Sequence, residues 1–336
     1  MSANRVHYAT QLVALGEYST GSGTEVHGVQ SVSTNTSFNL EQVTELGQLE
    51  IYENIENLPD VEVTIEKVLD GYPLIWHLAT PTASSNKLVN RSNLRTDMLL
   101  NIYDDDQSNA SGTPLTQVYC SGLYTNSLNY TLPVDGNSTE SVTFVGNDKV
   151  WRSSSFVNLT GFDGTDSPAS GVQRRQDVIM GVSGTASVWP TLIPGMQTIN
   201  GSGYNPDNTG EYSAHVQDVT ISVNFNRDDL FELGRKNPYY RYANFPIAVD
   251  CTINTSPGGT TPGDFVNARS DVDNLTDEPI LIKLEDSTTF NLGTKNKLQT
   301  ISQTGGDAGG GVMTVSYSFQ NLNALEISQN SDPAGL

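Results

Sequence analysis

One segment of this chain is written twice, and the repeat constrains the fold more than any other feature. Residues 29–59 align without a gap with residues 216–246, 187 positions further on. Eleven of the thirty-one aligned positions are identical, where ordinary composition would give about two. The identical positions are Val29, Gln30, Val32, Phe38, Asn39, Glu45, Leu46, Gly47, Tyr52, Asn57 and Pro59, matching Val216, Gln217, Val219, Phe225, Asn226, Glu232, Leu233, Gly234, Tyr239, Asn244 and Pro246. A self-match at this spacing indicates two fused copies of one folding unit.

The length of the chain fits this interpretation. Its 336 residues have room for two domains of about 165 residues, each large enough for a core. A stretch of low complexity, residues 153–171, lies between the two copies. We therefore predict a first domain over 1–160 and a second over 161–336, with repeat cores at 29–66 and 216–253.

Each copy begins with a strand pattern. Val219, Ile221, Val223 and Phe225 alternate with polar residues, and this period of two is typical of a strand with one buried face. The first copy has threonine at positions 34 and 36, where the second has isoleucine and valine. Threonine also suits a strand, so both copies predict one.

A short helix is expected to follow each strand. Asn39 and Asn226 are good N-cap residues, and Leu46 and Leu233 close an apolar stripe at helical spacing. Gly47 and Gly234 stand where a left-handed C-terminal cap belongs. The pattern predicts helices over 39–46 and 226–233, with the two leucines packed in the core.

More alternating runs follow Pro59 and Pro246. Glu62, Thr64 and Glu66 form the polar face of the first of these strands, while in the second copy the best register slips by one residue. Further expected strands are Met98–Tyr103, Gln117–Leu132, Val142–Val145, Ile280–Leu284, Leu298–Thr304 and Val312–Phe319. Many short strands with one small helix per half predict a mainly β fold, with two packed antiparallel sheets in each domain.

The composition limits what the chain can bind. Its net charge of −21 repels nucleic acid at close range, which disfavours reading or wrapping DNA. No apolar run approaches the thickness of a bilayer, so we expect no membrane partner. Cys120 and Cys251 are not equivalent under the repeat, which favours two core residues over an inherited disulfide.

No catalytic pattern is present in the sequence. The four histidines have no histidine or cysteine at metal-ligand spacing, and nucleophile-elbow and phosphate-loop motifs are absent. Asp104, Asp106 and Ser108 resemble a calcium loop but lack its glycine and glutamate, so a solvated turn is favoured. We expect no enzyme, cofactor or metal site.

Two segments resemble a known family. The second copy, over 216–246 with its run Asn226–Arg235 and the residues Tyr239–Tyr242, resembles the tail tube proteins of long-tailed bacteriophages. Residues 145–151, Val-Gly-Asn-Asp-Lys-Val-Trp, are similar to virion structural proteins. The resemblance covers about 30 residues in the second half and more weakly the matching part of the first.

This resemblance implies a structural virion protein of the phage tail. Stacked rings would form a tube whose inner sheets join into one barrel, through which the tape measure protein and DNA pass without specific binding. Tail sheath, baseplate and tail terminator proteins would be its other partners. The acidic balance then predicts a lumen lined by carboxylates, with Glu62, Thr64 and Glu66 as candidates. Phe38, Leu46, Gly47, Pro59, Phe225, Leu233, Gly234 and Pro246 are the candidate core and assembly residues.

The duplication predicts the number of chains in the ring. Rings of this family place six similar domains around the channel, and strand number fixes the bore. Three chains of two domains keep that bore, so we predict a homotrimeric, pseudo-hexameric ring.

A rival class is a β-sandwich adhesin or carbohydrate-binding virion protein, such as a tail fibre or decoration protein. Exposed aromatic residues would mark it, and Tyr239, Tyr240, Tyr242 and Phe245 form a cluster of that kind. Their place in the repeat favours packing beside the helix. An enzyme such as a depolymerase is the third and least favoured class.

Overall fold

The structure is a computed structural model that describes residues 6–47, 49–104, 113–153, 158–160, 171–180, 187–193, 214–257, 276–305 and 313–336. The expected interdomain stretch 153–171 and the calcium candidate at 104–108 lie largely outside the described residues. The domain boundary therefore stays a prediction.

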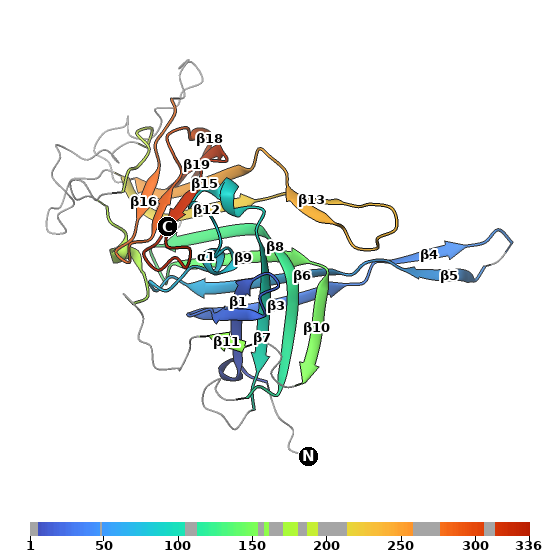
Figure 1. Ribbon diagram of the computed structural model, residues 1–336. Helices are drawn as coiled ribbons and strands as arrows, with labels where there is room; N and C mark the ends of the chain where they lie inside the picture. Colours follow the sequence, from blue (N-terminus) through green and yellow to red (C-terminus); the bar gives the residue numbers. More distant parts are fainter. Residues whose placement is uncertain are drawn as a thin grey trace.

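Strand β8 (Thr116–Pro133) is the longest strand of the largest sheet and connects its two parts (Figure 1). Its first part pairs with β7 (Arg95–Ile102) and β10 (Asp148–Ser153), and its second part pairs with β9 (Thr139–Gly146) and β12 (Ala214–Asn224). Gly122, between the two parts, has φ +67°, a backbone conformation that costs glycine little. The chain thus passes from one set of strand partners to another along a single long strand.

The second part of β8 belongs to a run of eight antiparallel strands. Their order is β3-β6-β9-β8-β12-β15-β19-β18. The remaining members are β3 (Val29–Ser37), β6 (Asp60–Val68), β15 (Ala248–Pro257), β18 (Lys297–Thr304) and β19 (Thr314–Leu322). The first four strands of this run come from the first half of the chain and the last four from the second half.

Smaller elements complete the fold. The strands β1 (Gln11–Glu17), β2 (Ser22–Glu25) and β11 (Asn158–Thr160) extend the sheet beyond β7, while β16 (Leu281–Lys283), β17 (Thr289–Asn291) and β20 (Glu326–Ser328) form a separate small sheet. The α-helices in the described residues are short, α1 (Ile75–Ala79) and α2 (Leu88–Arg91), and 3-10 turns occupy Tyr8–Thr10 and Arg175–Asp177. None of these helices has the length and apolar character needed to cross a bilayer. The expected mainly β, antiparallel class is confirmed.

The two halves of the eight-stranded run match in detail. β3 pairs with β6 as β12 pairs with β15, and both pairs carry a bulge, between Val29 and Ser31 and between Val216 and Asp218. β8 pairs with β9 as β18 pairs with β19, again with a bulge in each, between Thr125 and Ser127 and between Leu298 and Thr300. A residue of β3 therefore corresponds to the residue 187 positions later on β12, and a residue of β8 to the residue 173 positions later on β18.

The helices expected over 39–46 and 226–233 are wrong. These segments form β-hairpins that extend away from the sheet (Figure 1): β4 (Leu40–Thr44) with β5 (Ile51–Glu56), and β13 (Arg227–Leu230) with β14 (Tyr240–Ala243). The stripes that suggested helices are too short to bury against anything, and cross-strand pairing takes up the backbone groups instead. Gly47 and Gly234 do have positive φ, +97° and +88°, as residues of the hairpin ends.

The core is shared between the halves. Buried apolar residues of both form one contiguous cluster, from Val13 and Leu15 on β1 to Phe319 on β19 and Ile327 on β20. Because the sheet runs without interruption from β8 to β12, its apolar face is also continuous. Cys120 and Cys251 are buried in this cluster and are not disulfide-bonded, as the sequence predicted.

A buried polar network fastens the C-terminal segment to the first half. The guanidinium of Arg91, on α2, is fully buried and donates to the Asp332 carboxylate and to Asn86. Gln329 accepts from the Leu74 amide at 3.2 Å and donates to the Tyr72 carbonyl at 3.1 Å. The backbones of residues 86–88 and 325–327 also exchange hydrogen bonds. The last residues thereby cover helices α1 and α2.

The Arg91–Asp332 pair gives the first prediction. We expect Asp332→Ala to lower the free energy of unfolding by about 3–5 kcal/mol, because it leaves the buried Arg91 guanidinium without its anion. Chemical denaturation measures this loss. Glu232→Gln, which breaks an ion pair with Arg235 that is about half exposed, is the control and should cost less than about 1 kcal/mol. Equal effects for both variants would contradict the role of the network.

His77 gives a prediction about pH. Burial, with the nearby Arg91, lowers the pKa of His77 from 6.5 to about 4. The native state therefore keeps His77 neutral where the unfolded state binds a proton, so this residue makes stability fall as the pH drops from about 6.5 towards 4. Denaturation curves across this range should show a shallower decline for His77→Gln than for the wild type. The same slope in both proteins would contradict this assignment.

Candidate assembly surfaces

One face of the eight-stranded run is almost entirely polar. The strand registers place serine, threonine, asparagine and glutamine side chains side by side across all eight strands. One such row crosses the first half and the joint, and consists of Ser33, Thr64, Thr143, Ser127 and Asn224. Another crosses the second half, and consists of Thr220, Thr252, Ser318 and Thr300. The row Asn35, Glu62, Val145 includes one apolar residue. Cross-strand contacts include Thr64 with Thr143 at 3.2 Å and Asn254 with Asp218 at 2.6 Å.

The charge on this face is mainly negative. The predicted lumen candidates Glu62, Thr64 and Glu66 lie on it, on the side of β6 opposite the buried Val61, Val63 and Ile65. Asp218 and Asp250 add two carboxylates on β12 and β15, and Lys297 adds a cation at the end of β18. A hydroxyl- and amide-rich surface with this charge stays hydrated and offers little attraction to a polyanion.

The run ends in two edges. Within the described residues, β3 pairs only with β6 and β18 pairs only with β19. An unpaired strand edge presents backbone donors and acceptors that can pair with another chain. The equivalent strands in the middle of the run, β12 and β8, pair with each other. Each edge is thus the counterpart of a strand that has a partner.

The two hairpins, here called the first arm (β4–β5) and the second arm (β13–β14), share one register. Leu40 lies opposite Glu56 as Arg227 lies opposite Ala243, and Val43 opposite Glu53 as Leu230 opposite Tyr240. An isolated two-stranded hairpin is at best marginally stable in water. The first arm is nevertheless exposed along nearly its whole length, and carries exposed apolar side chains, which are Leu40, Leu46, Leu49, Ile51, Tyr52 and Ile55. Exposed apolar groups of this density indicate an interaction surface.

The residues just before each arm, here called its root, occupy equivalent positions in the repeat but differ in burial. Phe225, before the second arm, is fully buried and its amide donates to the Asn126 carbonyl of β8 at 2.9 Å. Phe38, its counterpart, is 71% exposed. The Arg227 guanidinium lies over the Tyr124 ring and donates to the Thr125 carbonyl at 2.6 Å. The root of the second arm therefore packs against β8, whereas the root of the first arm has no equivalent contact within the described chain.

Some of the predicted core and assembly residues lie in the body of the protein, and others lie exposed at the ends of the arms. Phe225 lies in the core, and Pro246 follows Phe245 through a cis peptide bond. The Pro59 carbonyl accepts from Asn147, which also reaches Asp60. Leu46 and Leu233 are fully exposed at the arm ends, so their expected burial in the core is wrong, because the helices that would have packed them are absent. Their part in assembly stays a prediction.

Tyr239 and Tyr240 line an open cleft of about 290 Å³ between the second arm and β8. Tyr18, Tyr124 and Arg95 are among its other lining residues. The Tyr240 ring meets Tyr124 edge-on at 6.4 Å, and Arg95 stacks on Tyr18 at 4.0 Å. The expected packing of these tyrosines beside a helix is wrong, since no helix is there. Several of the ring faces are occupied by contacts within the protein.

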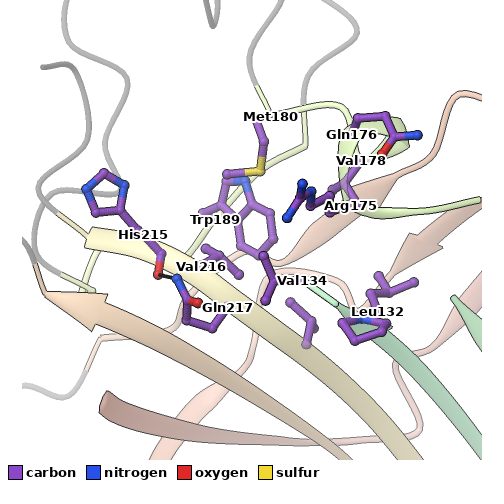
Figure 2. Close-up of a pocket in the computed structure, with 12 residues that line it drawn as sticks. Leu132, Val134, Arg175, Gln176, Val178, Met180, Trp189, His215, Val216 and Gln217 are labelled. Carbon is purple, nitrogen blue, oxygen red and sulfur yellow. Dashed lines mark hydrogen bonds between the residues drawn. The ribbon is translucent and has the colours of Figure 1, made fainter. Parts of the chain in front are cut away.

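A second cavity, of about 340 Å³, lies beside β12 (Figure 2). Leu132, Val134, Val178, Met180 and Trp189 give it mainly apolar walls, while Arg175, Gln176 and His215 lie at its margin. The His215 ring points away from Trp189 in this view. Among the described residues that line the cavity there are no paired carboxylates and no nucleophile with a base. In the described part of the chain no three histidine, cysteine or carboxylate side chains gather as a metal would need.

No protein-family model and no curated protein matches the chain. Solved structures that are similar include the tube-terminating cap of the anti-feeding prophage, at 11% identity and TM-score 0.33, over 44% of this chain and 91% of that one. The sheath/tube terminator of an extracellular contractile injection system, PVC, gives 12% identity and TM-score 0.34, over 46% and 100% of the two chains. A chain of the PVC sheath–tube complex gives 11% and 0.34, over 45% and 94%. TM-scores this low establish neither a shared fold nor a shared function.

The contrast between the two phenylalanines gives a matched prediction. Phe225→Ala should lower the free energy of unfolding of the single chain by about 3–5 kcal/mol, because it empties a filled core position. Phe38→Ala, at the exposed counterpart, should change it by less than about 0.5 kcal/mol. Denaturation of the unassembled chain measures both. A large loss for Phe38→Ala would show that the first arm is already seated in the single chain.

Proposed function

We propose that this protein is a structural component of a phage tail that assembles with copies of itself into rings, and that the rings stack into the tail tube. The observation that carries the proposal is the β8–β12 joint. There, one half of the sheet pairs with the other, and the free edges β18 and β3 are the counterparts of the two strands that make it. The same pairing between copies would extend the sheet from chain to chain.

A repeated joint of one kind closes into a ring when the rotation between units permits it. Each copy would add eight strands to a barrel whose polar face, with Glu62, Glu66, Asp218 and Asp250, turns inward. The matching strand order and bulges of the halves support the proposed duplication into domains at 1–160 and 161–336. Three such chains supply six similar halves, so we propose a trimeric, pseudo-hexameric ring.

This architecture gives the rest of the molecule a role. Both arms leave the sheet on the same side in Figure 1, and their ends carry the exposed Leu46 and Leu233. Apolar groups held away from the body suit contacts with a neighbouring ring. The inner surface would let a tape measure protein and DNA pass without binding, and sheath, baseplate and terminator proteins would be outer or end partners. No step of this function requires catalysis, a cofactor or a membrane.

Negative-stain electron microscopy and native mass spectrometry of the purified protein test the proposal. We expect hollow rings or tubes, and a ring mass of three times the 36.3 kDa chain. Assembly into rings of six chains would contradict the proposed trimer but would still support the proposed tube function. A protein that stays monomeric at high concentration and forms no tubes would overturn the function.

The lumen gives a separate prediction. Wild-type tubes should retain no duplex DNA in a filter-binding assay at low salt, because the polar face repels it. The double variant Glu62→Lys, Glu66→Lys should retain DNA, and Glu62→Gln, Glu66→Gln should not. Tubes in which all three proteins behave alike would place these residues outside the channel.

The aromatic cleft supports a second candidate, a carbohydrate-binding or adhesive virion protein. Tyr239 and Tyr240 are partly exposed there, and sugars bind on open aromatic faces beside polar groups. The contacts of Tyr240 with Tyr124 and of Arg95 with Tyr18 leave less ring surface for a sugar. Glycan-array binding that is lost in Tyr239→Ala, without any tube formation, would favour this candidate over the tube.

A further inference from the structure

The two chain segments that form the free edges carry charge of opposite sign, and a cation from outside these segments, the Lys149 ammonium of β10, donates to the Thr34 hydroxyl of β3 at 3.0 Å. The segment 29–66, which contains β3 and the first arm, has no lysine or arginine and holds Glu41, Glu45, Glu50, Glu53 and Glu56 on or beside the arm. The segment 287–305, which contains β18, has no aspartate or glutamate and holds Lys295 and Lys297. Charges of opposite sign on two edges favour their encounter and fix how they align.

The β8–β12 joint tells which residues would meet. Its register pairs Ser127 with Asn224, Asn129 with Ser222 and Tyr130 with Ile221. Under the correspondence given by the bulges, these pairs become Thr300 with Ser37, Ser302 with Asn35 and Gln303 with Thr34. Each of these positions is exposed or half-buried in the single chain, as an uncovered joint requires.

The contact at the root of the arm also has a counterpart. In the single chain Tyr240, on the second arm, meets Tyr124 at the start of the paired part of β8. The corresponding residues are Glu53, on the first arm, and Lys297, at the start of β18. In a joint between copies built on this template, an ion pair would stand where the single chain has an aromatic contact. Lys297 is about half exposed and also lies 2.8 Å from Asp277, so its ammonium sits at the surface.

We propose that the first arm is the docking element for a second copy of this chain. Its root, with Phe38 and Glu53, seats on the β18 end of the neighbouring copy, with Asn35 opposite Ser302 and Glu53 beside Lys297. The amide of Phe38 then donates to the Gln299 carbonyl of that copy, as Phe225 donates to Asn126 within the chain. This inference rests on the proposed self-assembly and adds its register, its partner surface and its electrostatic control.

The joint between copies is more polar than the joint within the chain. Ile221, Val223, Leu128 and Tyr130 are buried at the β8–β12 joint, whereas Thr34, Thr36, Ile301 and Gln303 take their places at the edges. Less apolar area is buried there, so the joint depends more on backbone pairing and on charge. Polar edges also keep the unassembled chain from associating without register.

Disulfide cross-linking of the full chain tests the register. Asn35→Cys combined with Ser302→Cys should give covalent multimers up to closed trimers on mild oxidation, read on non-reducing gels. Cys120 and Cys251 are buried and should not contribute. Asn35→Cys with Thr300→Cys, two residues out of register on the same strand, is the control and should link far less. Preferential linking of the control pair in rings that form normally would overturn the register.

Charge reversal tests the ion pair. Glu53→Lys and Lys297→Glu should each weaken association about tenfold or more, because like charges then face each other, and the double variant should recover most of it. Glu41→Lys makes the same change of charge one strand away and should weaken association less. Equal losses for Glu53→Lys and Glu41→Lys, with no recovery in the double variant, would overturn the pairing.

These outcomes separate the inference from the proposed function. If the wild-type protein forms rings but the variants fail both the cross-linking and the charge-reversal tests, the tube function is kept and this joint is rejected. A wild-type protein that forms no rings removes both. Circular dichroism of each variant before assembly shows that it is folded.

Discussion

The pairing of β8 with β12 is the interaction on which the rest of this structure depends. It fuses the strands of the first half with those of the second into one sheet and continues the apolar face across the joint. It also seats the second arm, since Phe225 and Arg227 both contact the β8 backbone. Without this pairing, each half of the sheet would have two unpaired edge strands, and the apolar core of each half would be left partly uncovered.

The same interaction explains an asymmetry between the copies. A strand in the middle of a sheet can carry large aliphatic side chains, because its neighbours cover them, whereas an edge strand with the same side chains would aggregate. β12 has Ile221 and Val223 where β3 has Thr34 and Thr36. The two copies thus differ at the strand that is paired on both sides in one copy, β12, and lies at a free edge in the other, β3. The exposed Phe38 is the exception, and in our account it is covered by the next copy.

The sequence predicted the fold class and most strands but not the nature of the arms. Alternation identified β6 because its apolar residues are buried while the polar residues between them are more exposed, and it also marked β8 and β18, although β18 is exposed along most of its length. The short stripe through Val43 and Leu46 fits a helix or a hairpin, and a left-handed glycine such as Gly47 ends either one. Which of them forms depends on pairing with a strand that begins several residues later, and local spacing does not contain that information.

The candidate surfaces were predictable only in part. Glu62, Thr64 and Glu66 could be placed on a solvated face from their alternation with Val61, Val63 and Ile65. The buried pair of Arg91 and Asp332 could not, because its members lie 241 positions apart and no local pattern links them. The correspondence of β8 with β18 also has no signal in residue identity, and it emerged from the matching strand pairing and bulges.

Hydrogen–deuterium exchange of the assembled and the single chain would test the central claim most directly. If the β8–β12 joint is the template for the joint between copies, amides of β3 and β18 should exchange quickly in the single chain. On assembly, both strands should become protected together, approaching the protection of β8 and β12. Rings in which β3 and β18 still exchange as they do in the single chain would contradict the account.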